Sequence, residues 1–272
     1  MAFQVEDYLR EDKLPHIWCA GCGHGITVRA LVEALAGLQI DPTSVVVTTG
    51  IGCFGKADDY LNTHCFHGTH GRALAFATGI KVVKPELTVF ALMGDGDSVT
   101  IGGNHLIHAA RRNVDITAIV ANNQNYGMTG GQLSATTPEG SRTTTSVYGT
   151  AEPEMDLCSL VAAAGASFVA RGTVYHVTQL QKIIQDAIQH KGFSFVEVVT
   201  MCPTYFGRYN WNQTLIERMN WLKENAVSKA RYDKLPPEKK ESAFMIGKLV
   251  EKDTEDFNTK YQRILQKAQN QG

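Results

Sequence analysis

The chain has 272 residues, a formal net charge of −1 and a hydrophobic content of 43%. This near-neutral charge argues against nucleic acid or an anionic membrane as the main partner, and no segment approaches the run of about 20 apolar residues that spans a bilayer. The first ten residues lack the apolar core of a signal peptide, so we expect a cytoplasmic protein.

Short apolar and β-branched runs alternate with helical patterns along the first 200 residues. The runs predicted to be strands are residues 44–49, 87–93, 116–121, 167–170 and 193–199. The patterns predicted to be helices are residues 26–38, 72–83, 105–112, 156–164 and 177–190. Apolar strands separated by helices indicate an α/β fold, with a mostly parallel sheet covered by helices on both faces. Charged side chains are sparse in this body, so we expect another subunit to cover part of it.

The character of the sequence changes near residue 210. We predict a main body over residues 1–210 and a charged helical C-terminal extension over residues 211–272, interrupted at Pro236 and Pro237. Residues 130–153 are rich in Gly, Ser, Thr and Pro, which predicts a long ordered or gating loop.

The loop after the first predicted strand matches most of a phosphate-binding loop. Gly50, Gly55 and Lys56 have the required spacing between a strand and a helix. Ala57, however, stands where a hydroxyl group would bind magnesium. A module that binds nucleoside triphosphates is therefore the less favoured hypothesis, and a tight glycine-rich turn is the favoured one.

Two further loops carry magnesium-type ligands. A Gly-Asp-Gly turn at residues 94–96 and an Asn-Asn pair at residues 122–123 follow adjacent predicted strands. Parallel strands bring such loops to one edge of the sheet, and Mg²⁺ prefers carboxylate and amide oxygens. The spacing is that of the thiamine-diphosphate motif. Transferred here, this motif predicts that the Asp95 and Asn123 side chains and the Asn125 carbonyl bind magnesium.

Four of the six cysteines are predicted to meet at the same edge. Cys19 and Cys22 form a Cys-x-x-Cys pair before the first helix, Cys53 lies on the first loop and Cys202 follows the last strand. In a reducing compartment such cysteines favour zinc or an iron–sulfur cluster, and their spacing alone leaves both open. The thiamine motif favours a cluster, since electron transfer beside that cofactor has an evident use. Cys158 lies in an apolar helix and is expected in the core.

Together these motifs resemble the thiamine-diphosphate-binding β subunits of the 2-oxoacid:ferredoxin oxidoreductases. The segments that carry the resemblance are 18–25 (WCAGCGHG), 50–53 (GIGC), 56–58 (KAD), 70–73 (HGRA), 77–81 (ATGIK), 94–105 and 123–132. The resemblance implies that a single [4Fe–4S] cluster is held by Cys19, Cys22, Cys53 and Cys202. The residues that it implies contact thiamine diphosphate are Ile51, Gly52, Cys53, Phe54, His70, Gly96, Asp97, Gly127 and Met128.

The resemblance also implies an activity. This is the reversible, coenzyme A-dependent oxidative decarboxylation of a 2-oxoacid, with electrons passing through the cluster to ferredoxin. Residues 129–132 and 205–210 look more like the type that converts 2-oxoglutarate to succinyl-CoA and CO₂. The absence of a side chain at Gly130 leaves room for this longer acid. Lys56 lies where the family places a substrate-side cation, although a solvated loop lysine is the alternative.

Several points stay open from the sequence. Arg142, Arg208 or a residue of a partner could bind the second carboxylate of 2-oxoglutarate. An enzyme for pyruvate or for many 2-oxoacids is one alternative, and a non-redox thiamine enzyme with structural zinc is another. The family's pyrimidine-activating glutamate belongs to a separate α subunit, so we expect a heterodimer and an inactive isolated chain.

Overall fold

The computed structural model describes residues 2–270 of the chain. In this range an eight-stranded sheet has the order β2-β1-β3-β4-β6-β5-β8-β7. The strands are β1 (Val45–Thr49), β2 (His64–His67), β3 (Thr88–Gly94), β4 (Thr117–Asn122), β5 (Phe168–Thr173), β6 (Ser194–Val199), β7 (Ala226–Ser228) and β8 (Phe244–Glu251). Neighbouring strands of the described sheet run parallel except β5 and β8, which are antiparallel. The predicted α/β fold with a mostly parallel sheet is confirmed.

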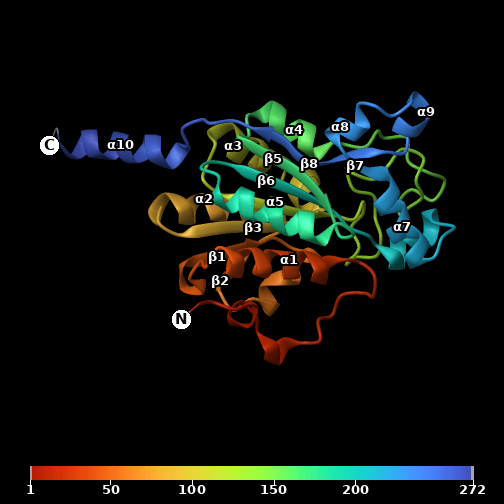
Figure 1. Cartoon of the computed structure of the whole chain (residues 1–272), viewed down its shortest axis with the longest axis horizontal. Coiled ribbons are helices and arrows are strands. Elements are labelled where there is room, and N and C mark those ends of the chain that lie inside the picture. The colour runs from red at the N-terminus through yellow and green to blue at the C-terminus, as the bar shows by residue number, and fades with distance from the viewer. Residues whose placement is uncertain (1, 271–272) are drawn as a thin grey trace.

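Helices cover both faces of the sheet (Figure 1). The longer helices of the body are α1 (His24–Gly37), α2 (Ala73–Val83), α3 (Gly103–Arg112), α4 (Leu157–Ala164) and α5 (Val177–Gln189). Helices α1 and α5 pack together over one apolar core, and α2, α3 and α4 pack over the other. Successive residues of β3 alternate between these cores: Phe90 and Leu92 face the first, while Ala91 and Met93 face the second. Burial on both faces explains why the central strands are almost wholly apolar.

The C-terminal residues differ from the helical extension that the sequence predicts. After α6 (Arg208–Asn210), residues 211–270 form α7 (Leu215–Asn225), α8 (Lys229–Tyr232), α9 (Pro237–Lys240) and α10 (Phe257–Gln269), together with β7 and β8. The prediction of helices alone is therefore corrected, because β8 joins the main sheet beside β5. Strand β8, which lies between β5 and β7, is only partly buried and contains Gly247 and Lys248, so it lacks the apolar run that reveals the central strands. Pro237 begins α9, a position that proline favours.

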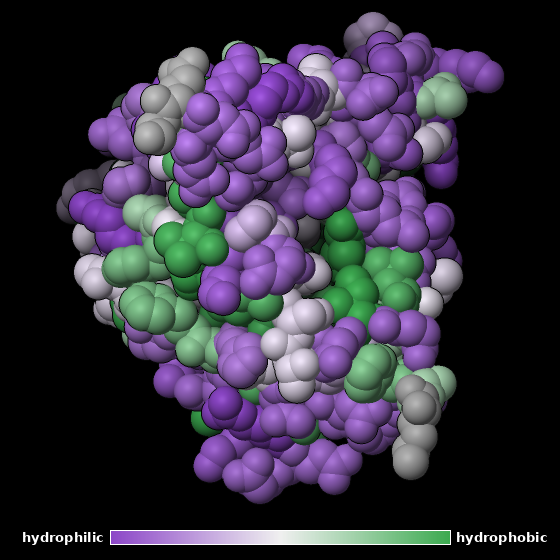
Figure 2. Space-filling view, turned by 90° about the vertical axis from the view of Figure 1, so that its left-hand side faces the viewer, coloured by the Kyte–Doolittle hydropathy of each residue, from purple (hydrophilic) through white to green (hydrophobic). Residues whose placement is uncertain are grey.

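The short helical turns of the chain connect these elements. They are η1 (Val5–Tyr8), η2 (Glu11–Lys13), η3 (Pro42–Ser44), η4 (Phe54–Tyr60), η5 (Gly96–Ile101) and η6 (Pro203–Gly207). Helix α10 extends beyond the body at the end of the molecule opposite α7 (Figure 1). Figure 2 shows that apolar side chains gather across the middle of this end, with hydrophilic side chains above and below. Among residues 2–270 no helix has the length and apolar character needed to cross a bilayer.

Candidate active site at the carboxyl edge of the sheet

The loops that follow β1, β3 and β4 surround one pocket. Its lining consists of His24, Ile51, Gly52, Cys53, Phe54, His70, Gly94, Asp95, Gly96, Asp97, Ala121, Asn123, Asn125, Tyr126, Gly127, Met128 and Thr129. All residues that the sequence predicts as diphosphate contacts or magnesium ligands belong to this lining. The structure thus brings them together because β1, β3 and β4 are parallel neighbours that end at the same edge.

Asp95 is buried at the end of β3, with 1% of its surface exposed. Its Oδ2 accepts hydrogen bonds from Ser134 Oγ at 2.5 Å and from Thr136 Oγ1 at 2.6 Å. Burial raises the pKa of this carboxyl, and the two hydroxyl groups act in the opposite direction. A buried carboxylate is costly unless a cation compensates it, so the site favours a metal ion beside Asp95.

The Asn123 side chain faces two oxygens at this point. One terminal atom of its amide lies 2.8 Å from the Asn125 carbonyl oxygen and 3.0 Å from Asp95 Oδ1. With nitrogen there, the amide donates to both oxygens. With oxygen there, the Asn123 oxygen faces the other two at the spacing of neighbouring ligands in a magnesium octahedron, about 2.9 Å for metal–oxygen distances near 2.0–2.1 Å. The donor set therefore fits Mg²⁺, as the motif predicts.

Asp97 also lines the pocket, and its carboxylate lies against the loop after β1. Its Oδ1 is 2.5 Å from His70 Nδ1 and accepts from the Gly71 amide at 2.6 Å. Its Oδ2 is buried and has no hydrogen-bond partner within the described chain. A Cβ atom on Gly50 would lie 1.9 Å from this oxygen, so glycine at position 50 is a steric requirement.

Close packing also accounts for the resemblance to a phosphate-binding loop. A Cβ atom on Gly55 would lie 2.6 Å from the Gly50 carbonyl oxygen. Gly50 and Gly55 thus let the chain turn tightly against Asp97, which agrees with the favoured hypothesis of a glycine-rich turn.

The four cysteines approach one another from three segments of the chain. Gly127 lies between two of them, since a Cβ atom there would be 3.4 Å from Cys53 Sγ and 3.5 Å from Cys202 Sγ. The Met201 amide donates to the Cys22 carbonyl at 3.0 Å and fastens the N-terminal loop to the Cys202 segment. Cys19 Sγ accepts from Thr204 Oγ1 at 3.2 Å.

The thiols also influence one another electrostatically. Burial, followed by the neighbouring thiols of Cys202, Cys22 and Cys19, raises the pKa of Cys53 to about 12. Burial is likewise the main reason that the pKa of Cys22 is raised. Buried thiols that lie close together ionise with difficulty, because each negative charge disfavours the next. Binding to a cationic metal centre compensates these charges, and the thiols then bind as thiolates. The cysteine set therefore fits a metal or a cluster.

Lys56 lies outside the pocket lining, in η4. Its ammonium group forms a 2.6 Å ion pair with Asp59, and this hydrogen bond raises the pKa of Lys56. The lysine is thus a partly exposed cation with an acidic neighbour, one turn away from Cys53.

Four residues of this region were not predicted from the sequence as parts of the site. His24 and Tyr126 line the pocket, while Ser134 and Thr136 hold Asp95 from the long loop. Burial lowers the pKa of His24 to about 4, and its imidazole is therefore neutral. Tyr126 packs against Gly96, where a Cβ atom would lie 2.4 Å from the ring. Ser134 and Thr136 belong to no recognisable motif, since loops rich in Ser and Thr are common.

Comparisons with known proteins show the family to which the chain belongs. Residues 42–198 match the family model of the C-terminal TPP-binding domain of thiamine pyrophosphate enzymes. The 2-oxoglutarate synthase subunit KorB of Methanocaldococcus jannaschii is 43% identical over 264 residues, which are 97% of this chain and 98% of that protein. The corresponding subunit of Archaeoglobus fulgidus is 57% identical over 206 residues, 75% of this chain and 76% of that protein.

A solved structure is similar over almost the whole chain. It is the 2-oxoglutarate:ferredoxin oxidoreductase from Magnetococcus marinus with 2-oxoglutarate, coenzyme A and succinyl-CoA bound. The TM-score is 0.86 at 28% sequence identity, and the match covers 98% of this chain and 91% of that one. The fold, the pocket and the relatives agree, and the chain therefore belongs to the 2-oxoacid:ferredoxin oxidoreductase family, as a thiamine-pyrophosphate-binding β subunit of the 2-oxoglutarate synthase type.

Proposed function

We propose that this chain, together with an α subunit, converts 2-oxoglutarate and coenzyme A to succinyl-CoA and CO₂ and passes the electrons to ferredoxin. One observation carries the proposal. The segment that follows β4 supplies Asn123 and Asn125 to the magnesium-type site, and two residues later Gly127 lies against the sulfurs of Cys53 and Cys202. A diphosphate cofactor and a redox centre would therefore be neighbours in one chain.

Residues of three loops would hold the cofactor. Asp95, Asn123 and the Asn125 carbonyl would bind Mg²⁺, which anchors the diphosphate. When bound, thiamine diphosphate supplies a carbanion that adds to the keto carbon and accepts the electron pair released with CO₂.

Further lining residues, with Asp97, would shape this site. Ile51, Gly52, Phe54, Gly96 and Met128 would enclose the cofactor. The His70 ring is held by Asp97 and would contact the cofactor from the pocket lining.

The metal centre is proposed to be a single [4Fe–4S] cluster held by Cys19, Cys22, Cys53 and Cys202. Its position beside the pocket supports a redox role, because electrons released in the decarboxylation would have a short path. A structural zinc ion is the competing assignment. Analysis of iron, acid-labile sulfide and zinc in anaerobically purified protein decides between them. Zinc without sulfide would overturn the cluster.

Cationic side chains would recognise the two carboxylates of the substrate. We propose that Lys56 attracts the carboxylate beside the keto group, and that Arg142 or Arg208 faces the distal one. The Arg142 amide donates to Asn210 Oδ1 at 2.8 Å, and the Asn210 side chain donates back to the Arg142 carbonyl at 2.8 Å. This double hydrogen bond fastens the long loop to α6, which begins at Arg208.

We propose an α subunit as the partner, and the family and the surface of the chain support this. The chain has an apolar band at its α10 end (Figure 2) and exposes Val83, Ile216 and Ile264 to more than half of their full extent. Surfaces of this kind suit association with another protein. Co-purification with the α subunit, followed by ferredoxin reduction with a panel of 2-oxoacids, tests the proposal. Activity with 2-oxoglutarate well above that with pyruvate is expected, and activity of the isolated chain would contradict it.

A further inference from the structure

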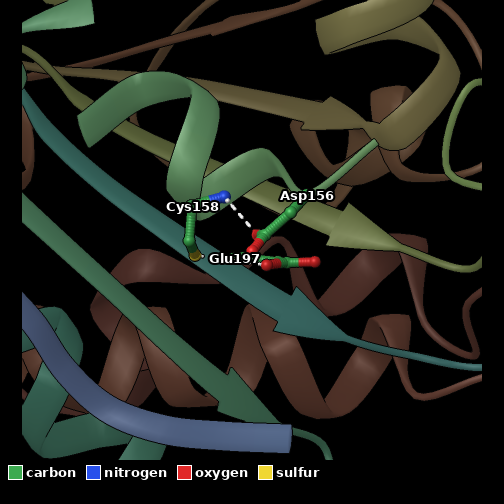
Figure 3. A group of neighbouring side chains, drawn as sticks. All are labelled: Asp156, Cys158 and Glu197. Atoms are coloured by element: carbon green, nitrogen blue, oxygen red, sulfur yellow. Dashed lines mark hydrogen bonds between the residues drawn. The ribbon is translucent and has the colours of Figure 1, made fainter. Parts of the chain in front are cut away.

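A cluster of two carboxylates and a thiol lies outside the pocket, on the opposite side of β4 from β3. It comprises Glu197 on β6, with 3% of its surface exposed, the buried Cys158 in the first turn of α4, and the exposed Asp156 that caps this helix. Figure 3 shows the three side chains converging, and their donor atoms all lie within 4.8 Å of one another. Taken alone, this set of ligands resembles a cation site.

Arg171 already supplies the cation. It is the cross-strand neighbour of Glu197 on β5. Its Nε donates to Glu197 Oε2 at 2.7 Å, and its Nη2 donates to Asp156 Oδ1 at 2.7 Å. A guanidinium group that bridges two carboxylates satisfies both charges. Cys158 Sγ completes the set by donating to Glu197 Oε2 at 3.2 Å, so the cluster is a closed hydrogen-bond network.

The second oxygen of Glu197 points toward the active site. Glu197 Oε1 accepts a hydrogen bond from Asn122 Nδ2 at 2.8 Å. With its nitrogen fixed in this way, the Asn122 amide presents its oxygen to the Gln124 backbone amide, which donates to it at 3.1 Å. Gln124 has a left-handed backbone with φ of 65°, a conformation that a non-glycine residue keeps only when its surroundings hold it there.

A continuous chain of contacts therefore runs from Arg171 through Glu197 and Asn122 to the turn that carries Asn123 and Asn125. We propose that Glu197, oriented by Arg171, is a positioning residue for the magnesium-binding turn. The inference rests on the magnesium site of the proposed function. Without the acceptor at Oε1 the Asn122 amide loses its fixed orientation, and the turn no longer aligns its two ligands. Partners that orient metal ligands typically change metal affinity by about 10- to 100-fold.

The decisive variant is Glu197→Gln in the full chain, purified with its α subunit. The introduced amide has one acceptor and one donor, so it cannot accept from both Arg171 and Asn122. We expect Mg²⁺-dependent binding of thiamine diphosphate, measured by titration calorimetry, to need about 10- to 100-fold more Mg²⁺. Amide hydrogen exchange over residues 122–127 should also accelerate in the cofactor-free protein, a readout that does not require catalysis.

Two further variants separate positioning from general damage. Cys158→Ala removes a cluster member that does not touch Asn122, and it should leave the Mg²⁺ requirement unchanged. The double variant Asn122→Asp with Glu197→Gln restores complementarity, because the introduced amide donates to the introduced carboxylate and still accepts from Arg171. It should recover most of the affinity that Glu197→Gln loses, whereas Asn122→Asp alone places two carboxylates face to face and should not.

The outcomes are distinct. The inference is overturned if Glu197→Gln binds Mg²⁺ as tightly as the wild type, or if the double variant binds no better than the single one. A larger loss in Cys158→Ala than in Glu197→Gln would overturn it in favour of a metal site within the cluster. Failure of the wild-type complex to bind Mg²⁺ and thiamine diphosphate at all would overturn the proposed function itself.

Discussion

The Ser134 hydroxyl lies 2.5 Å from Asp95 Oδ2 and holds that carboxylate at the end of β3. Thr136 donates to the same oxygen, and Thr137 donates to the Gln124 carbonyl at 2.7 Å. The segment 134–137 thus contacts both halves of the proposed magnesium site, which come from β3 and β4. The Ser- and Thr-rich loop over residues 130–153 therefore helps to position the residues of the proposed magnesium site.

Removing the two hydroxyl groups on Asp95 tests this role. In the variant Ser134→Ala with Thr136→Val, Asp95 loses both hydrogen bonds to Oδ2 and gains rotational freedom. We expect the Mg²⁺ requirement for thiamine diphosphate binding to rise by about 10- to 100-fold, as measured by calorimetry. Thr144→Val changes an exposed hydroxyl of the same loop and should have no effect. Equal binding by both variants would refute the role of the hydroxyl pair.

Neutralising Asp95 should abolish cofactor binding without lowering the stability of the cofactor-free chain. Asp95→Asn removes the charge that attracts Mg²⁺, so cofactor binding should fall below detection. The thermal midpoint of the cofactor-free chain should not fall, because an uncompensated buried carboxylate is unfavourable. Differential scanning calorimetry with and without Mg²⁺ and cofactor provides the comparison. Cofactor-dependent stabilisation that survives in Asp95→Asn would place the metal elsewhere.

The packing of Gly50 against Asp97 gives a steric prediction. Gly50→Ala should displace Asp97 from His70, weaken thiamine diphosphate binding and destabilise the fold by about 1–3 kcal/mol. Gly79→Ala is the matched control. Gly79 lies in α2, where nothing lies within 4 Å of the added Cβ, and alanine should stabilise this helix by about 0.5–1 kcal/mol. Chemical denaturation measures both effects, and equal values for the two variants would contradict the packing argument.

The cysteines can be distinguished by their environment. Cys53→Ser should lower the iron and acid-labile sulfide content and the visible absorbance of the anaerobically purified protein, since Cys53 lies beside Cys202 at Gly127. Cys65→Ser alters a partly buried thiol on β2 that is hydrogen-bonded to the Thr63 hydroxyl. The iron content of this variant should match that of the wild type. Loss of iron from both variants, or from neither, would argue against the assigned ligand set.

Much of this architecture follows from local sequence features. The strands β1, β3, β4 and β6 are buried on both faces, so their apolar runs predict them to within one residue at either end. Their parallel order brings the following loops to one edge, which is why the lining of the pocket could be named from motifs. The Gly-Asp-Gly turn and the Asn-Asn pair are informative because few other arrangements need that combination.

Other features are not encoded locally. The edge strand β2 consists of His64, Cys65, Phe66 and His67, and it forms because β1 offers it a free parallel edge. Strand β8 joins the sheet through β5, far away in sequence. Ser134, Thr136 and Glu197 act only through residues brought near them by the fold. Such contacts between distant segments carry no periodicity, so sequence patterns cannot reveal them.

The central claim is that electrons released from 2-oxoglutarate pass to a cluster in this chain. Anaerobic electron paramagnetic resonance of the complex with its α subunit tests this most directly, after mixing with Mg²⁺, thiamine diphosphate, coenzyme A and 2-oxoglutarate but without ferredoxin. We predict the signal of a reduced [4Fe–4S] cluster in the wild type, and its absence in Cys53→Ser and Asp95→Asn. A wild-type complex that holds its cofactors yet shows no cluster reduction with 2-oxoglutarate would contradict the claim.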